Sequence, residues 1–205
     1  MNNMMKSITY YLLGSSLIAV GIVINVYSKI GLGPFDAASA NLSKLIDLSI
    51  GMSMNIILLI LLLTQLIIKP SWTYFFGTLF SFIIGIMVDV FMPLISEPTL
   101  FAVKLLYFIG SLALFPVGVS LMISSKIAVG PIENLPLLIH KITGLRYFIS
   151  KMSFEIIYVI LALIFGYLSN IGIGYVQIGT LIIMIYIGPA IQFCIKFIPI
   201  IKKSA

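Results

Sequence analysis

The chain alternates between long apolar segments and short polar stretches that are rich in glycine, proline and charged residues. An apolar helix needs about 20 residues to cross about 30 Å of hydrocarbon, and most of these segments approach or exceed that length. A membrane barrel would instead show strands of about 10 residues with alternating polarity. The pattern predicts six transmembrane helices, over Ile8–Tyr27, Met52–Ile68, Trp72–Ile95, Ala102–Ser124, Ser153–Leu168 and Gly174–Phe197.

The last two segments leave alternatives open. The fifth is short unless Ile149 and Met152 extend it. The sixth can tilt, or kink at Gly188-Pro189, because a proline inside a helix removes a backbone donor. Five spans in place of six would put the two termini on opposite sides of the membrane.

The composition indicates that lipid is part of the solvent. Hydrophobic residues make up 61% of the 205 residues, charged residues only 9%, and the mean hydropathy is +1.22. A soluble domain carries about 25% charged residues. Because backbone groups in hydrocarbon must be satisfied within each segment, we expect a single all-α, polytopic transmembrane domain over residues 1–205.

Few residues offer chemistry. Cys194 is the one cysteine and His140 the one histidine, so we expect no metal site, no cofactor and no enzyme. The net charge of +6 is expected to reflect lysines that face anionic lipid, and we expect no nucleic-acid partner.

Two polar connections, Pro34–Ile50 and Pro131–Tyr147, have helical periodicity of their own. Each predicts a short amphipathic helix, which either lies in the membrane interface or re-enters the protein where a wet cavity or protein covers it. The first pairs the apolar positions Phe35, Ala38, Leu42, Leu45 and Ile46 with the polar stripe Asp36, Ser39, Ser43 and Asp47. The second pairs Ile132, Leu135, Ile139 and Ile142 with Glu133 and His140.

The two halves of the sequence resemble each other. Residues 10–53 align with residues 107–150 without a gap, and apolar composition does not explain the polar and glycine matches. These matches include Gly21 with Gly118, Ser28 with Ser125, Lys29 with Lys126, and Gly33-Pro34 with Gly130-Pro131. We therefore predict internal repeats over about 8–98 and 103–201.

Each repeat contains a span, an amphipathic segment and two further spans. Because three spans is an odd number, the second repeat must be inverted in the membrane relative to the first. Many transporters have this plan, with their site near the midplane between the repeats. The alternative is that duplication merely builds a helical bundle.

The distribution of basic residues predicts the orientation, because cytoplasmic loops are enriched in lysine and arginine. With six spans, one side carries Lys6, Lys69, Lys126, Lys141, Arg146, Lys151, Lys196, Lys202 and Lys203, and the other carries only Lys29, Lys44 and Lys104. Both termini are therefore expected to be cytoplasmic.

The motif that the repeats share suits the start of a helix. Glycine before the helix, proline in its first position and an acid in its third satisfy and complement the free N–H groups. These acids are therefore either structural caps or part of a solute pocket where the two helix starts meet. An acid in this place disfavours an anion and favours a cation, a donor-rich solute or a proton. The candidate residues are Gly33, Pro34, Asp36, Gly130, Pro131, Glu133 and Asn134.

Other polar residues near apolar segments are further candidates. Glu155 is expected inside the membrane, where an acid is a functional candidate unless it only pairs with Lys151 or Arg146. His140 lies seven residues after Glu133, which suggests a proton relay, although Pro136 between them distorts the helix. Asp89 and Gln192 are secondary candidates, and Asp89 can also be interfacial.

These motifs resemble the YczE/YitT-like bacterial integral membrane proteins, and the YczE branch most closely. The resemblance covers nearly the whole chain and rests on Gly31-x-Gly33-Pro34-Phe35-Asp36-Ala37, Gly130-Pro131-x-Glu133-x-Leu135, Thr143-Gly144-Leu145, Gly172-x-Gly174 and Gly188-Pro189. YitT-like members usually add a soluble C-terminal domain, which we do not expect here. The resemblance implies a multi-pass protein of the bacterial plasma membrane and no particular substrate.

Three functions fit these observations. The first is a secondary transporter or exporter of a small solute, with the pathway between the repeats. The second is the substrate-binding subunit of a modular uptake system with energising partner subunits. The third is a membrane scaffold or regulator that transports nothing. In each case the lipid bilayer is a partner, and a homo-oligomer is compatible with all three.

Overall fold

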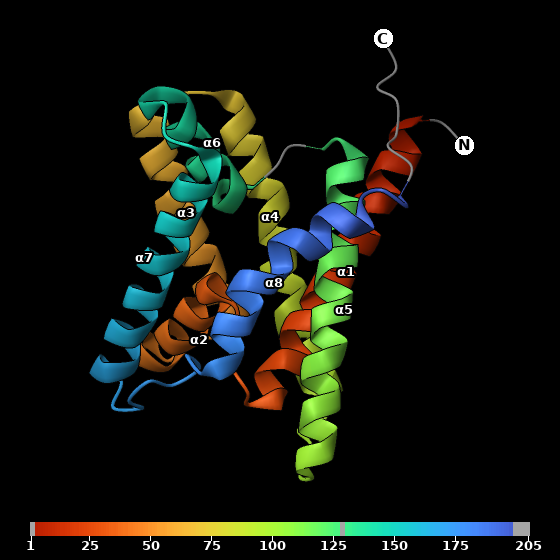
Figure 1. Cartoon of the computed structure of the whole chain (residues 1–205), viewed down its shortest axis with the longest axis vertical. Coiled ribbons are helices and arrows are strands. Elements are labelled where there is room, and N and C mark those ends of the chain that lie inside the picture. Colours follow the sequence, from red (N-terminus) through yellow and green to blue (C-terminus); the bar gives the residue numbers. More distant parts are fainter. Residues whose placement is uncertain (1–2, 128–129, 199–205) are drawn as a thin grey trace. The chain divides into compact units, whose positions relative to one another are not determined.

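The computed structural model of the chain describes residues 3–127 and 130–198, and within these ranges it contains helices and no strand (Figure 1). The all-α prediction is therefore confirmed. The helices are α1 (Asn3–Ser28), α2 (Pro34–Ile46), α3 (Ile50–Ile68), α4 (Trp72–Phe91), the short 3₁₀ turn η1 (Met92–Leu94), α5 (Phe101–Ser125), α6 (Pro131–Thr143), α7 (Tyr147–Leu168) and α8 (Ile178–Cys194).

Among the described residues, five helical stretches are long and apolar enough to cross a membrane, which confirms a polytopic membrane protein. They are Met4–Ser28, Ile50–Ile68, Trp72–Leu94, Phe101–Ser125 and Tyr147–Leu168. The fifth predicted span is thus longer than Ser153–Leu168 and includes Ile149 and Met152. α8 is apolar but has only 17 residues, which corresponds to a rise of about 25 Å.

The predicted start of the sixth span at Gly174 was wrong. Gly172 and Gly174 have positive φ angles of 65° and 54°, so the chain is still turning there. The helix begins only after Gln177, whose side chain accepts from the backbone of Thr180 while the Thr180 hydroxyl accepts from the backbone of Gln177. This reciprocal cap sets the boundary and shortens the helix.

The two amphipathic segments both form helices, α2 and α6, of 13 residues each. α6 follows the predicted pattern, with Gly130 before the helix, Pro131 in its first position and Glu133 in its first turn. Gly144 ends it with a φ of 74°, a left-handed conformation that glycine adopts without strain.

The ends of α1 and α5 have the same local structure. Ser28 donates to the Asn25 carbonyl at 2.6 Å and accepts from the Ile30 N–H at 3.2 Å. Ser125 makes the matching bonds, to the Met122 carbonyl and from the Ile127 N–H, at the same distances. Lys29 and Lys126, which follow these serines, both have left-handed φ angles, of 54° and 59°. The aligned residues therefore adopt one conformation at both places, while the full repeats stay a prediction, and residues 199–201 lie outside the described ranges.

The described chain forms two compact units. Unit 1 consists of residues 3–33, 87–127 and 177–198, and unit 2 consists of residues 34–86 and 130–176. Each unit therefore draws segments from both halves of the sequence.

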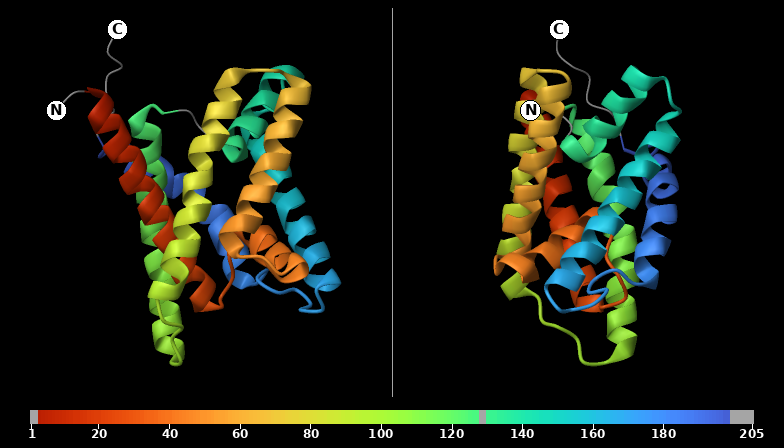
Figure 2. Two further views of the ribbon diagram at one scale, coloured as in Figure 1. Left: turned by 180° about the vertical axis from the view of Figure 1, so that it is seen from behind. Right: turned by 90° about the vertical axis from the view of Figure 1, so that its left-hand side faces the viewer.

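In unit 1, α1 packs along α5, and α8 packs on α5 (Figure 2). Hydrogen bonds link α1 and the residues after it to other parts of this unit. The Tyr27 hydroxyl of α1 donates to the Met92 carbonyl of η1 at 2.8 Å, and the Gly179 N–H of α8 donates to the Ile30 carbonyl at 2.9 Å. Lys29 forms an ion pair with Glu97, which lowers the pKa of that exposed carboxyl.

The glycines of α1 and α5 differ in how much space surrounds them. A Cβ on Gly14 would lie 2.6 Å from the Gly118 carbonyl oxygen, whereas a Cβ on Gly21 would have ordinary contacts from 3.6 Å outward. We expect Gly14→Ala to destabilise the protein by about 1–3 kcal/mol through overpacking. Gly21→Ala should leave stability unchanged or raise it, because alanine is the better helix former. The apparent Tm of the two purified variants tests this, and equal Tm values would contradict the close approach of α1 and α5.

In unit 2, α2 packs against α7 and α3, and α6 packs against the same two helices (Figure 1). Every residue of α2 from Pro34 to Ser43 is buried, including the polar Asp36 and Ser39. A helix lying in the membrane interface would expose its polar face. The structure therefore favours the embedded alternative for α2. α6 is only partly covered, with Pro131, Leu135, Pro136 and Leu138 buried.

Candidate functional site

Three of the predicted acids come together in unit 2. Asp36 lies in the first turn of α2, Glu133 in the first turn of α6, and Glu155 in the third turn of α7. The carboxyl of Asp36 is within electrostatic range of both glutamates. Each of the two Gly-Pro helix starts thus contributes one acid to the same region.

Lys151 supplies a positive charge to this region. Its ammonium lies 3.1 Å from the Glu155 carboxylate, one helical turn away, so the predicted pair is present. The charge of Lys151 also acts on Glu133. We call Asp36, Glu133, Glu155 and Lys151 the acid cluster, which contains three carboxyls and one ammonium.

Burial changes the pKa values of Asp36 on α2 and Glu133 on α6. Neither of these two short helices is among the candidate membrane spans. Burial, followed by the charges of Glu155 and Glu133, raises the pKa of Asp36 to about 7. Burial also raises the pKa of Glu133, while the charge of Lys151 acts in the opposite direction. Asp36 can therefore gain or lose a proton near neutral pH.

An aromatic group borders the cluster. The rings of Phe35 and Tyr158 meet edge to face with centroids 5.6 Å apart, and Phe154 lies 6.4 Å from Tyr158. Tyr158 is only 1% exposed, and its hydroxyl has no hydrogen-bond partner among the described residues. The same ring is within electrostatic range of Glu133 and Glu155. A buried hydroxyl without a partner is uncommon in proteins.

Sequence reasoning missed Tyr158, since a tyrosine within an apolar helix usually contributes to packing. The available signal was its position three residues after Glu155, on the same face of the helix.

Asn41 fixes α2 in place and was also missed. Its side chain is completely buried. The Nδ2 group donates to the carbonyls of Ala162 and Ile173 at 2.7 and 3.4 Å, and Oδ1 accepts from the Tyr175 N–H at 3.0 Å. Asn41 thereby ties α2 to α7 and to the loop that follows α7.

Gln65 links α3 to the start of α6. It is completely buried, and its Nε2 donates to the Pro131 carbonyl at 3.1 Å. Within the described residues its Oε1 has no partner. Gly130 packs closely in the same area, because a Cβ there would collide with the side chain of Ser81. These contacts position the turn that carries Glu133.

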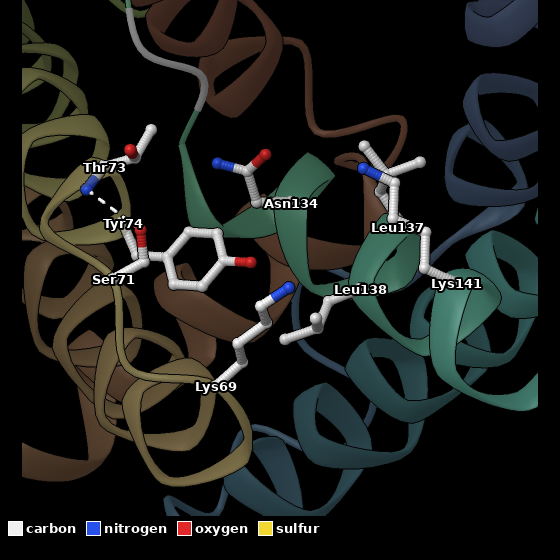
Figure 3. A pocket seen from close by; sticks show the side chains of 8 residues that line it. All are labelled: Lys69, Ser71, Thr73, Tyr74, Asn134, Leu137, Leu138 and Lys141. Atoms are coloured by element: carbon white, nitrogen blue, oxygen red, sulfur yellow. Dashed lines mark hydrogen bonds between the residues drawn. The ribbon is translucent and has the colours of Figure 1, made fainter.

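The remaining candidates lie elsewhere. Asn134 lines a pocket to which none of the three acids contributes (Figure 3). Asp89 and Gln192 belong to unit 1, where Gln192 is exposed. His140 bonds through Nδ1 to the Leu145 carbonyl, and its ring contacts Tyr147, so its side chain is engaged in the turn between α6 and α7.

Gly33 is buried just before α2.

Among the described residues, no three His, Cys, Asp or Glu side chains are arranged to hold one metal ion.

Comparison with known proteins identifies relatives over most of the chain. Residues 5–196 match the family described as "Family of unknown function (DUF6198)". The chain is 28% identical over 198 residues to the "Uncharacterized protein YyaS" of Bacillus subtilis, which covers 95% of this chain and 93% of that protein. It is 27% identical over 138 residues to the "Uncharacterized membrane protein YczE" of the same organism, which covers 66% and 64%. No solved structure matches the chain at a significant level. The resemblance to the YczE branch is thus confirmed.

Proposed function

The chain belongs to the DUF6198 family, and we propose that it transports a small organic cation or donor-rich solute across the bacterial plasma membrane. The observation that carries this proposal is the acid cluster beside the unpartnered, buried hydroxyl of Tyr158. The membrane character of the chain is established by its apolar helices and its relatives.

The charge of the cluster favours a cation. Three carboxyls face one ammonium, so the region is negative when all of them are ionised. The acids at the two helix starts also cancel the positive ends of the helix dipoles, which would otherwise attract an anion.

The aromatic rings support an organic cation in particular. The ring of Tyr158 is within electrostatic range of Glu133 and Glu155, and the rings of Phe35 and Phe154 contact it. Aromatic faces attract ammonium groups by about 0.5–1 kcal/mol at exposed sites and by about 2 kcal/mol when the site is dry. The Tyr158 hydroxyl can bond to a donor on the solute or to a water that accompanies it.

The repeats supply a route for alternating access. In this proposal the halves are inverted copies, each contributes one Gly-Pro helix start, and the acids of α2 and α6 lie on the pathway between them. Asp36 exchanges a proton for the cation, since its raised pKa lets it bind either one near neutral pH. In this arrangement both termini are cytoplasmic, and the excess of basic residues on their side supports that orientation.

The test is transport by the reconstituted protein. Liposomes with an acidic interior and a trapped pH dye receive quaternary ammonium and guanidinium compounds, which do not cross lipid as neutral bases. We expect these cations to release protons from protein-containing liposomes only. Absence of proton release, together with absence of thermal stabilisation across the panel, would overturn the proposal.

Glu133→Gln is expected to slow this exchange by about 10- to 100-fold, because a hydrogen bond to a charged group contributes about 1.5–3 kcal/mol. Glu97→Gln is the matched control, as Glu97 is an acid of unit 1 with its side chain half-exposed. Equal exchange rates in the two variants would place the transported cation away from the acid cluster.

A further inference from the structure

Unit 2 contains a second polar region, distinct from the acid cluster. A pocket of about 300 Å³ lies where the connection between α3 and α4 meets α6 (Figure 3). Pockets for small ligands begin at about this size. It is lined by Lys69, Ser71, Thr73, Tyr74, Asn134, Leu137, Leu138 and Lys141.

The charge of the pocket is positive. Lys69 follows the last residue of α3, and Lys141 lies in the last turn of α6. No aspartate or glutamate lines the pocket. Within the described residues neither ammonium pairs with a carboxylate. The lining of the pocket therefore includes two lysines and no carboxylate to balance them.

The neutral polar side chains around these lysines can all donate hydrogen bonds. Ser71, Thr73 and Tyr74 carry hydroxyls, Asn134 carries an amide, and Figure 3 shows the side chains of Lys69 and Tyr74 pointing toward α6. α4 begins at Trp72 between these residues and has no acid in its first turn. The positive end of its dipole therefore adds to the two lysines. By contrast, α2 and α6 each carry an acid in this position.

We propose that this pocket binds a phosphate group, carried either by the headgroup of an anionic lipid or by a free phosphate compound. Two ammonium groups and several neutral donors complement a phosphate, which offers only acceptor oxygens. Leu137 and Leu138 form the apolar part of the lining.

The surroundings of the pocket also suit a lipid. Trp72, next to the pocket residues Ser71 and Thr73, is 78% exposed, and its ring contacts that of Phe75, which contacts Phe76. Exposed tryptophans are enriched at the level of lipid headgroups. Basic pockets between membrane helices on the cytoplasmic side commonly bind anionic headgroups, and both lysines lie on the side that the sequence assigns to the cytoplasm.

The experiment uses Trp72 as a reporter, because it is the one tryptophan of the chain. Purified protein in neutral detergent is titrated with inorganic phosphate, with short-chain phosphatidylglycerol and with short-chain phosphatidylcholine, while Trp72 emission and the apparent Tm are recorded. We expect phosphatidylglycerol, but not phosphatidylcholine, to change the emission and raise the Tm. A response to inorganic phosphate as well would show that the phosphate itself is recognised, and a response to phosphate alone would assign the pocket to a soluble compound.

The paired variant Lys69→Gln/Lys141→Gln is expected to weaken the response by about 10- to 30-fold. The control Lys6→Gln/Lys196→Gln removes the same charge from two exposed lysines of the same predicted side and should respond like the native protein. Tyr74→Phe keeps the ring and should weaken the response less than the paired variant. No response to any phosphate compound, or equal responses in the two paired variants, would overturn the proposal.

Discussion

Replacing Asp36 by asparagine is expected to stabilise the protein at pH 8 and to abolish proton-coupled exchange. The pKa of this carboxyl rises from its ordinary value of 3.8 to about 7, mainly through burial and then through the charges of Glu155 and Glu133. The folded protein therefore binds this proton more tightly than the unfolded chain does. The corresponding stability is complete below pH 3.8 and is lost as the pH rises to about 7.

Asparagine resembles the protonated acid and suffers no such loss. At about 1.36 kcal/mol per pH unit, the native protein gives up at most about 4 kcal/mol across this range. The Tm of Asp36→Asn minus that of the native protein should thus be larger at pH 8 than at pH 5. The same variant should show no cation-driven proton release, because its amide cannot exchange a proton.

Apparent Tm values between pH 5 and pH 8 test the first expectation, and the liposome assay tests the second. Asp47→Asn is a suitable control, as Asp47 follows α2, is exposed and has a left-handed φ that asparagine also tolerates. Parallel Tm curves for the native protein and Asp36→Asn would show that Asp36 does not titrate in this range. Full exchange by Asp36→Asn would remove it from the pathway.

Asn41→Leu is expected to cause the largest loss of stability that a single polar substitution produces in unit 2. Asn41 makes three hydrogen bonds across the unit, to Ala162, Ile173 and Tyr175. Leucine has a similar size but leaves the backbone groups of Ala162, Ile173 and Tyr175 without this partner. Each buried group that is left unsatisfied costs about 1–3 kcal/mol.

The neighbouring glycines show that little rearrangement is possible. A Cβ on Gly166 or Gly174 would collide with the Asn41 side chain, and Gly174 also has a positive φ of 54°. We therefore expect the loop at residues 169–177 to detach from α2 in Asn41→Leu, which lowers the Tm and slows exchange because the start of α2 carries Asp36.

The measurements are the apparent Tm and the rate of proteolysis in this loop. Ser39→Ala is the matched control, because Ser39 is also completely buried on α2 but donates to the Phe35 carbonyl of its own helix, at 2.9 Å. A Tm of Asn41→Leu equal to that of Ser39→Ala would mean that the bonds of Asn41 do not hold the loop.

The sequence by itself determined the helices and the chemistry at their starts. Gly130, Pro131 and Glu133 act within a single turn, so their residue types predict the start of α6 without knowledge of any neighbour. The pair of Lys151 and Glu155 is likewise local, since residues four apart lie on one face of a helix. The membrane character follows from composition, which needs no contact at all.

The sequence predicts less well where a helix begins after a connecting loop. The start of α8 depends on the reciprocal cap between Gln177 and Thr180 and on the turns at Gly172 and Gly174. Prediction from hydropathy treats these residues as part of the apolar segment, because hydropathy does not reveal φ angles. The sixth span was therefore predicted too long.

Only the tertiary structure decided what covers each helix. The periodicity of α2 predicts a polar stripe, but α7 and α3 bury that stripe and turn Asp36 into an acid with a raised pKa. Asn41 and Gln65 owe their roles to hydrogen-bond partners far away in the sequence, and the ring of Tyr158 contacts that of the distant Phe35. Lys69 and Lys141 likewise line one pocket although 72 positions separate them. Side-chain polarity is written in the sequence, whereas burial and charge coupling arise from distances between segments, and these distances determine which acids titrate and which polar groups remain available for a solute.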